Sequence, residues 1–271
     1  MRIGVIGDRG TGCSTWIGLL LQSMEKFTNE HPEMFNYFMD RDTTEMVINN
    51  IRNPLLGGVP PRKTDNLEIS TSFKGNKTKG FLRRGKKKVT LQITDTLANK
   101  GSTDQIATND IISQDIIVLL LDCSRLGNKV YKKKNLDLIN VYKRCWTRYP
   151  DKCPVPIIFF TKIDRLPMPI IRKLPNHSED LLYDYLEYDE ETINEDGKFI
   201  LQKCYSSLYI TLYDKKGKNF PEPKIFFSWM GIRDDRYEVL RYNTKQGDEI
   251  VSNRYPYNHY YEFIRLIDII I

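Results

Sequence analysis

The chain has 271 residues, of which 40% are hydrophobic and 28% are charged. These proportions are typical of a folded globular protein and exclude collagen-like, coiled-coil and disordered chains. No apolar run reaches the roughly 18 residues that a membrane span requires, and the first residues lack the pattern of a signal peptide, so we expect a cytoplasmic protein. The five cysteines include no C-x-x-C pair, which argues against a zinc site. The formal net charge of +6 does not by itself indicate a nucleic-acid partner.

The predicted elements alternate between strands and helices, a pattern typical of an α/β protein with a mostly parallel sheet. Residues 3–6 form a short apolar strand that ends in a glycine-rich turn, and residues 14–27 carry apolar side chains at helical spacing. Residues 29–53 give no clear pattern beyond a partly helical one. Alternating apolar side chains predict two antiparallel strands, near residues 67–71 and 89–93.

The second half of the chain contains two continuous apolar runs, 115–122 and 155–160, that are typical of central strands buried on both faces. A helix is expected between them, from about residue 135 to 149. Residues 165–223 are rich in proline, tyrosine and acidic residues, and we interpret them as an insertion. Its last part, 199–213, suits a helix or a strand. A third buried strand, 224–228, and an amphipathic helix over 257–271 close the chain.

The strongest functional motif is Gly7-Asp8-Arg9-Gly10-Thr11-Gly12-Cys13-Ser14, which lies between the first strand and the first helix. A glycine-rich turn in this place is typical of a phosphate-binding P-loop, because backbone N–H groups and the helix N-terminus attract an anion. The hydroxyl of Ser14 stands where a magnesium ligand is expected. Cys13 replaces the lysine that would bridge the terminal phosphates, and Arg9 or Lys63 are candidates to supply that charge instead. A turn that joins strand to helix without any ligand is the alternative interpretation.

Two further strand ends carry side chains that suit a nucleotide site. Asp95 follows the strand near 89–93 and can hold magnesium through a water molecule. In the run Thr161-Lys162-Ile163-Asp164, the aspartate can accept two N–H groups from a guanine edge, while the lysine stem lies along the purine ring. Taken singly, Asp164 is better explained as a helix cap, whereas together with the glycine loop it favours a base contact.

These motifs, in this order, resemble the P-loop small GTPases, of the Ras-like, Rag-like and double-GTPase kinds. The resemblance implies a Ras-like α/β fold with about six mainly parallel strands and helices on both faces, in a single domain of residues 1–271 with 165–223 inserted. Thr64 resembles the switch threonine, Asp95 resembles the start of the second switch, and Ser228-Trp229 stands in the place of the last base-contacting motif. GTP or GDP and magnesium are the implied ligands, and protein regulators or effectors are the implied partners.

The resemblance places the expected site residues in three groups. The residues expected to bind the nucleotide are Gly7, Asp8, Arg9, Gly10, Thr11, Gly12, Cys13, Ser14, Thr15, Thr161, Lys162, Asp164, Ser228 and Trp229. The expected magnesium ligands are Ser14, Thr64 and Asp95. The expected catalytic segment holds Thr64, Ala98 and Asn99, of which Ala98 replaces a glycine and Asn99 replaces the water-orienting glutamine. Because Cys13, Ala98 and Asn99 depart from the family pattern, we expect guanine-nucleotide binding with slow or partner-dependent GTP hydrolysis.

Two other hypotheses stay open. The same departures suit a nucleotide-free pseudo-GTPase that keeps the fold as a protein-interaction scaffold. The run Arg83-Arg84-Gly85-Lys86-Lys87-Lys88, between the two antiparallel strands, carries charge that suits the phosphates of nucleic acid or lipid. A solvated charge patch that protects a sheet edge is the simpler explanation of this run, so the sequence alone does not predict a nucleic-acid partner.

Overall fold

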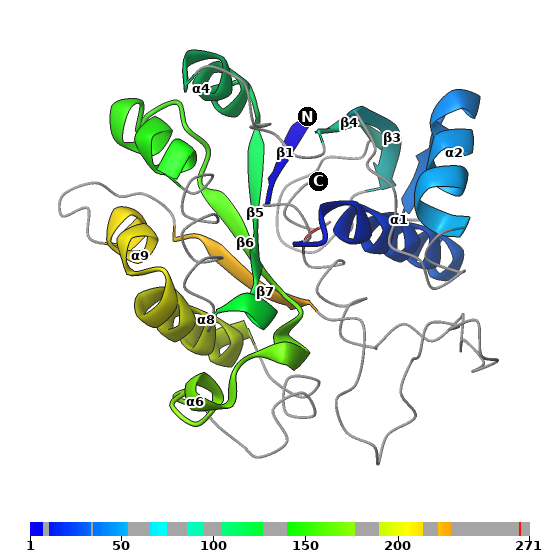
Figure 1. Ribbon diagram of the computed structural model, residues 1–271. Helices are drawn as coiled ribbons and strands as arrows, with labels where there is room; N and C mark the ends of the chain where they lie inside the picture. Colours follow the sequence, from blue (N-terminus) through cyan, green and yellow to red (C-terminus); the bar gives the residue numbers. More distant parts are fainter. Residues whose placement is uncertain are drawn as a thin grey trace, which may run out of the picture. The chain divides into compact units, whose positions relative to one another are not determined.

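The structure is a computed structural model that describes residues 1–7, 11–33, 35–53, 66–74, 86–94, 104–126, 140–176, 190–213, 222–228 and 266. Within these ranges the chain is an α/β protein with a mixed, mostly parallel sheet of seven strands (Figure 1). The strands are β1 (Arg2–Ile6), β2 (Phe35–Phe38), β3 (Asn66–Lys74), β4 (Lys86–Thr94), β5 (Ile116–Asp122), β6 (Pro156–Thr161) and β7 (Lys224–Ser228). Their order in the sheet is β2-β3-β4-β1-β5-β6-β7. The predicted α/β class is confirmed, and the sheet has one strand more than the six expected.

The helices of the described ranges agree with most of the helical predictions. They are α1 (Cys13–Glu30), α2 (Arg41–Val47), the π-helical η1 (Ile48–Arg52), α4 (Asp104–Ile112), the short η2 (Cys123–Arg125) and η3 (Ile163–Arg165), α6 (Met168–Ile171), α8 (Glu190–Cys204) and α9 (Ser206–Tyr213). Residues 140–148 are also helical, inside the range predicted for a helix. The sequence left helix and strand as alternatives for segment 199–213. The structure has helices there, the last part of α8 and the whole of α9. None of these helices is both long and apolar enough to cross a membrane.

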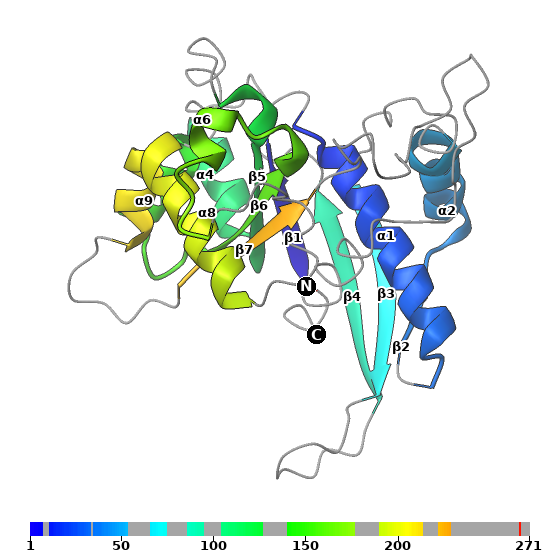
Figure 2. The same cartoon turned by 90° about the horizontal axis from the view of Figure 1, so that it is seen from below.

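The chain divides into two compact units, and the first comprises Met1–Ile3, Ser14–Asp95 and Arg241–Ile271. In this unit β3 and β4 pair in antiparallel fashion, as predicted, with Ile69 opposite Leu91. The antiparallel strand β2 pairs with β3 on its other side. Helix α1 lies beside β3 and β4 in both views, and its residues 16–21 are all buried, among them Trp16, Ile17 and Leu20 (Figure 2). Of the predicted helix over 257–271, the structure describes Leu266, which is helical and buried.

The second unit, Gly4–Cys13 and Thr96–Leu240, contains the parallel strands β5, β6 and β7. Their residues are almost entirely buried, and the rings of Phe159 and Phe226 stack with centroids 4.9 Å apart across β6 and β7. The three predicted central strands are therefore confirmed. The register pairs Asp122 with Thr161 and Thr161 with Ser228. These three side chains consequently end neighbouring strands in one row, at the carboxyl edge where ligands bind in parallel sheets. The single domain with an insertion stays a prediction.

Helix α2 of the first unit begins at an aspartate cap. The carboxylate of Asp40 accepts a hydrogen bond of 2.7 Å from the backbone N–H of Thr43, and this bond holds the pKa of the Asp40 carboxyl below its usual value. The ionised cap therefore stabilises the helix at pH values above the ordinary carboxyl pKa. This contribution is lost as the pH falls through the lowered pKa.

Helix α8 of the second unit packs closely along β7, as both views show. A Cβ atom at Gly197 would lie 2.4 Å from Cγ2 of Ile225 and 3.1 Å from its Cδ1. Real Cβ atoms do not approach another carbon that closely, so Ile225 or the helix would have to move. The contact explains why a glycine stands in the middle of a helix, where it costs about 1 kcal/mol relative to alanine.

Exchange of Gly197→Ala is therefore expected to lower the free energy of unfolding by about 1–2 kcal/mol, because overpacking outweighs the gain in helix propensity. Urea unfolding followed by circular dichroism measures the change. In an Ile225→Ala background, which removes the two nearest contacting atoms and leaves Cβ at 3.3 Å, the same exchange is expected to stabilise the chain by up to about 1 kcal/mol. Equal effects in the two backgrounds would contradict the assigned contact.

Candidate functional site

The glycine-rich loop joins β1 to α1, as the sequence predicts. Gly12 has a φ of 98°, in the left-handed region that glycine adopts without strain. Helix α1 begins at the next residue, Cys13, so the positive end of the helix dipole lies at the end of this loop. A glycine turn followed at once by a helix N-terminus is an arrangement that suits a bound anion.

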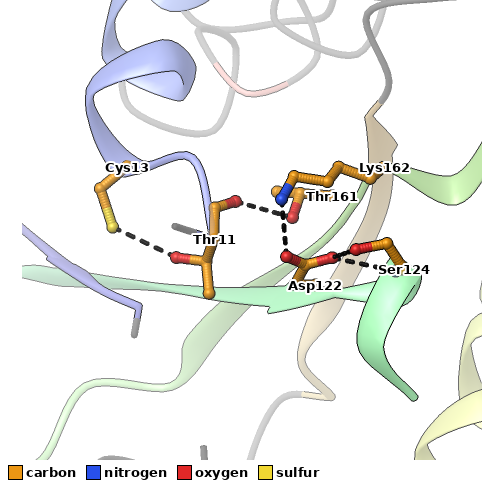
Figure 3. A network of polar contacts seen from close by, with 6 residues as sticks. All are labelled: Thr11, Cys13, Asp122, Ser124, Thr161 and Lys162. Atoms are coloured by element: carbon orange, nitrogen blue, oxygen red, sulfur yellow. Dashed lines mark hydrogen bonds and ion pairs between the residues drawn. The ribbon is translucent and has the colours of Figure 1, made fainter. Parts of the chain in front are cut away.

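Gly7, which follows β1 directly, lies close to Thr11 and Cys13. A Cβ atom at Gly7 would lie 2.4 Å from Oγ1 of Thr11, 2.8 Å from Sγ of Cys13 and 3.2 Å from Cβ of Leu120. Oγ1 of Thr11 is itself 3.6 Å from Sγ of Cys13, and both side chains are buried (Figure 3). Position 7 thus needs a glycine for steric reasons, and the thiol of Cys13 faces Thr11.

One hydrogen bond joins the glycine loop to β6. The hydroxyl of Thr161 donates to the backbone oxygen of Thr11 over 2.9 Å, although 150 positions separate the two residues in the sequence (Figure 3). Thr161 is the last residue of β6, is buried, and opens the predicted base motif. The bond therefore brings the first residue of one predicted motif to the backbone of the other, within the same compact unit.

The lysine of the predicted base motif is held by an ion pair that the sequence analysis missed. Nζ of Lys162 donates to Oδ2 of Asp122 over 2.7 Å, and the Asp122 side chain is fully buried while that of Lys162 is 32% exposed. The other carboxylate oxygen, Oδ1, accepts the backbone N–H of Ser124 at 2.9 Å and its hydroxyl at 2.6 Å. Asp122 thereby caps η2 and holds Lys162 with one carboxylate (Figure 3).

Lys162 is fixed at both of its ends. Its backbone has φ 55° and ψ 42°, a left-handed conformation that costs free energy for a residue with a Cβ atom. Its ammonium group is fixed by Asp122, so the methylene stem between the two ends has a defined course. Because the carboxylate neutralises the ammonium, the pair adds little net charge to the site. Lys162 thus offers the candidate site a fixed apolar methylene stem more than a positive charge.

The structure brings several predicted site residues together and leaves others outside its description. Contacts join Thr11 to Cys13 and to Thr161, Gly7 leaves no space for a side chain beside Thr11 and Cys13, and Lys162 follows Thr161 directly. Ser14 and Thr15 lie in the first turn of α1, and Ser228 is the buried last residue of β7. Asp164 belongs to η3, and its side chain is outside the described part. Outside the described residues lie Asp8, Arg9, Gly10, Lys63, Thr64, Asp95, Ala98, Asn99 and Trp229.

Asp122 and Ser124 belong to the contacts of the candidate site, and sequence reasoning missed them. A signal for Asp122 was present, because a carboxylate at the carboxyl end of a buried strand lies where parallel sheets carry their polar ligand-binding groups. Only the pairing of β5 with β6 shows that this carboxylate ends its strand beside Thr161 and reaches Lys162.

No protein-family model matches the chain, and the comparison with curated proteins finds no match. The resemblance to small GTPases therefore rests on the motifs, their order and the contacts described above.

Proposed function

We propose that the chain is a guanine-nucleotide-binding molecular switch of the small-GTPase type, with a Ras-like arrangement of its sheet and helices and with slow or partner-dependent GTP hydrolysis. The observation that supports this most is the hydrogen bond from Thr161 to the backbone of Thr11. It joins the glycine loop, which suits phosphates, to the strand end from which Lys162 and Asp164 follow. A nucleotide needs a loop that binds its phosphates and side chains that contact its base. In α/β proteins both are found at the carboxyl edge of parallel strands.

The site residues predicted from the sequence have the following roles in this proposal. Gly7 and Gly12 allow the loop backbone to approach phosphates, and the N-terminus of α1 supplies positive potential. The Lys162 stem covers one face of the purine, and Asp164 accepts N–H groups from its edge. Ser14 holds magnesium together with Thr64 and Asp95. The magnesium ion, when bound, supplies positive charge beside the terminal phosphates.

Cys13 determines the turnover that we expect. Its thiol faces Thr11 and carries no positive charge to set against a terminal phosphate. Phosphoryl transfer is catalysed largely by cations that stabilise the charge developing in the transition state. The loss of one such cation lowers turnover more than binding, so the nucleotide is expected to bind and to be hydrolysed slowly unless a partner protein supplies an arginine.

Titration of the purified, nucleotide-stripped chain with fluorescent GDP, GTP and ATP tests the proposal. We expect micromolar or tighter binding of both guanine nucleotides, weakened when a chelator removes magnesium, and binding of ATP at least about tenfold weaker. A folded sample that binds none of the three nucleotides would overturn the proposal. Equal affinity for ATP and GTP would overturn the guanine site while leaving a phosphate loop.

A second candidate function is a protein-interaction scaffold that has the fold without the nucleotide. The observation that favours it is again Cys13, whose side chain is 9% exposed and whose Sγ lies 3.6 Å from Oγ1 of Thr11. In this alternative the residue serves as packing inside the loop. The titration separates the two functions, because the scaffold requires the folded chain to bind no nucleotide.

Exchange of Asp164→Asn is expected to shift the nucleotide preference from guanine towards xanthine. The carboxylate accepts N–H groups that guanine offers, whereas an amide presents a donor that suits the additional oxygen of xanthine. Loss of a charge-assisted bond of this kind corresponds to an affinity for GDP about 10- to 100-fold lower. Competition of GDP and XDP against a fluorescent guanine nucleotide measures the shift.

The matched control for this exchange is Asp110→Asn, which makes the same chemical change at an exposed position of α4. It is expected to leave both affinities unchanged. Retained guanine preference in the Asp164→Asn variant would remove Asp164 from the base site.

A further inference from the structure

Strands β3 and β4 belong to the most positively charged part of the chain. The 26 residues from Ile69 to Thr94 contain eight lysines or arginines and no aspartate or glutamate. Lys74 lies within β3, and Lys86, Lys87 and Lys88 lie within β4. The modest net charge of the whole chain conceals this concentration, because nine carboxylates are gathered elsewhere, between Glu179 and Asp196.

The register of the two strands places like charges opposite each other. Lys74 of β3 pairs with Lys86 of β4, and Ser72 pairs with Lys88. Directly paired residues share a face of the sheet, and so do residues two positions apart in one strand. Lys74, Lys86 and Lys88 therefore belong to one face, which we name, with Ser72, the lysine face.

By register, the positions of the lysine face follow Ser70 and Gln92 on one side of the strand pair. Ser70 and Gln92, which the alternation assigns to this side, are exposed, whereas Ile69 and Leu91 of the other side are buried. The register rows on the exposed side pair Glu68 with Gln92, Ser70 with Thr90, Ser72 with Lys88, and Lys74 with Lys86. These eight positions hold hydroxyl, amide and charged residues and no apolar residue.

This arrangement is unfavourable for a patch that only faces solvent. Like charges directly opposite each other destabilise a strand pair, and on this side the one acidic position among the register rows is Glu68, three rows away from the lysine row. Protection of a sheet edge by charge does not require two lysines in the same register row. An anionic ligand on this face removes the repulsion, so the register favours a binding role.

We propose that the lysine face binds the phosphate backbone of nucleic acid. Lysine and hydroxyl side chains are among the groups that most often contact nucleic-acid phosphates. Strands β3 and β4 lie inside the sheet, between β2 and β1, so we propose a contact of phosphates with this face and not the insertion of the strands into a groove. An anionic membrane fits less well, because stable attachment to a bilayer combines basic charge with apolar side chains, and the eight positions of this side carry none.

The test is a binding titration of the full chain with short labelled duplex DNA and with labelled single-stranded RNA, at several salt concentrations. With three lysines on phosphates, the logarithm of affinity is expected to fall with the logarithm of salt concentration with a slope of about −2 to −3. The triple variant Lys74→Gln, Lys86→Gln, Lys88→Gln is expected to bind at least about tenfold more weakly at low salt and with a flatter slope. Its thermal unfolding is expected at the same or a higher temperature, because the exchange removes like-charge repulsion.

The matched control is a variant with glutamine at three exposed lysines outside β3 and β4, Lys152, Lys173 and Lys203, which makes the same change in net charge. It is expected to bind both nucleic acids nearly as well as the unmodified chain. Equal loss in the two variants would show an effect of net charge alone and overturn the assigned face. The absence of binding at low salt would also overturn it, and so would binding to phosphatidylserine vesicles but to neither nucleic acid.

Discussion

Exchange of Asp122→Ala is expected to lower the free energy of unfolding by about 3 kcal/mol, the lower end of the range for breaking a buried ion pair. The exchange removes the acceptor 2.7 Å from Nζ of Lys162, together with the acceptor of both hydrogen bonds from Ser124. Because Lys162 is 32% exposed, water can solvate its ammonium in part, which keeps the cost from being higher. Urea unfolding monitored by circular dichroism measures the change.

A double-mutant cycle isolates the ion pair from the cap of η2. In a Lys162→Met background the pair is already absent, so Asp122→Ala is expected to cost less, by about 1–3 kcal/mol. Ser124→Ala removes only the 2.6 Å hydroxyl bond and is expected to cost about 1 kcal/mol. Costs for Asp122→Ala and Lys162→Met that simply add would contradict the ion pair.

The row of strand ends places three buried polar residues side by side in the candidate site. Asp122, Thr161 and Ser228 end three neighbouring parallel strands and are all buried. Asp122 fixes the side chain of Lys162, and Thr161 fixes the backbone of the glycine loop. The strand ends therefore form a rigid platform, and groups held by such a platform keep the defined positions that ligand recognition requires.

The fold was predictable from sequence where burial leaves a continuous pattern. Strands β5, β6 and β7 are apolar along almost their whole length because both faces are covered, and they lie where the apolar runs predict them. Strand β2 was not predicted, because it has four residues, of which Phe35 is buried and Phe38 is 69% exposed. Four residues with such a pattern give no periodicity that distinguishes a strand from a loop.

The candidate site was predictable where it depends on neighbouring residues. The left-handed turn at Gly12 and the start of α1 follow from glycine placement within a few residues. The ion pair of Asp122 with Lys162 joins positions 40 residues apart, and it depends on β5 and β6 being neighbours. Motif spacing does not determine strand order, so this contact could not be derived from the sequence. The roles of Thr64, Asp95, Ala98 and Asn99 stay predictions.

Exchange of Gly7→Ala is expected to lower the free energy of unfolding by about 3 kcal/mol, at the upper end of the usual cost of overpacking. The new Cβ would stand 2.4 Å from Oγ1 of Thr11 and 2.8 Å from Sγ of Cys13. Both neighbours are short, buried side chains, so the loop backbone has to move. That movement also strains the hydrogen bond from Thr161 to Thr11, which contributes about 1 kcal/mol.

The same exchange connects stability to the proposed nucleotide site, because the loop that must move is the loop proposed to hold phosphates. Gly7→Ala is therefore expected to weaken GDP binding even under conditions where the variant remains folded. In a background with Thr11→Ala and Cys13→Ala, which removes both contacting atoms, the exchange is expected to cost only about 1 kcal/mol, the usual lower limit of overpacking. An undiminished cost in that background would mean that Leu120, and not the loop, is what excludes a side chain at position 7.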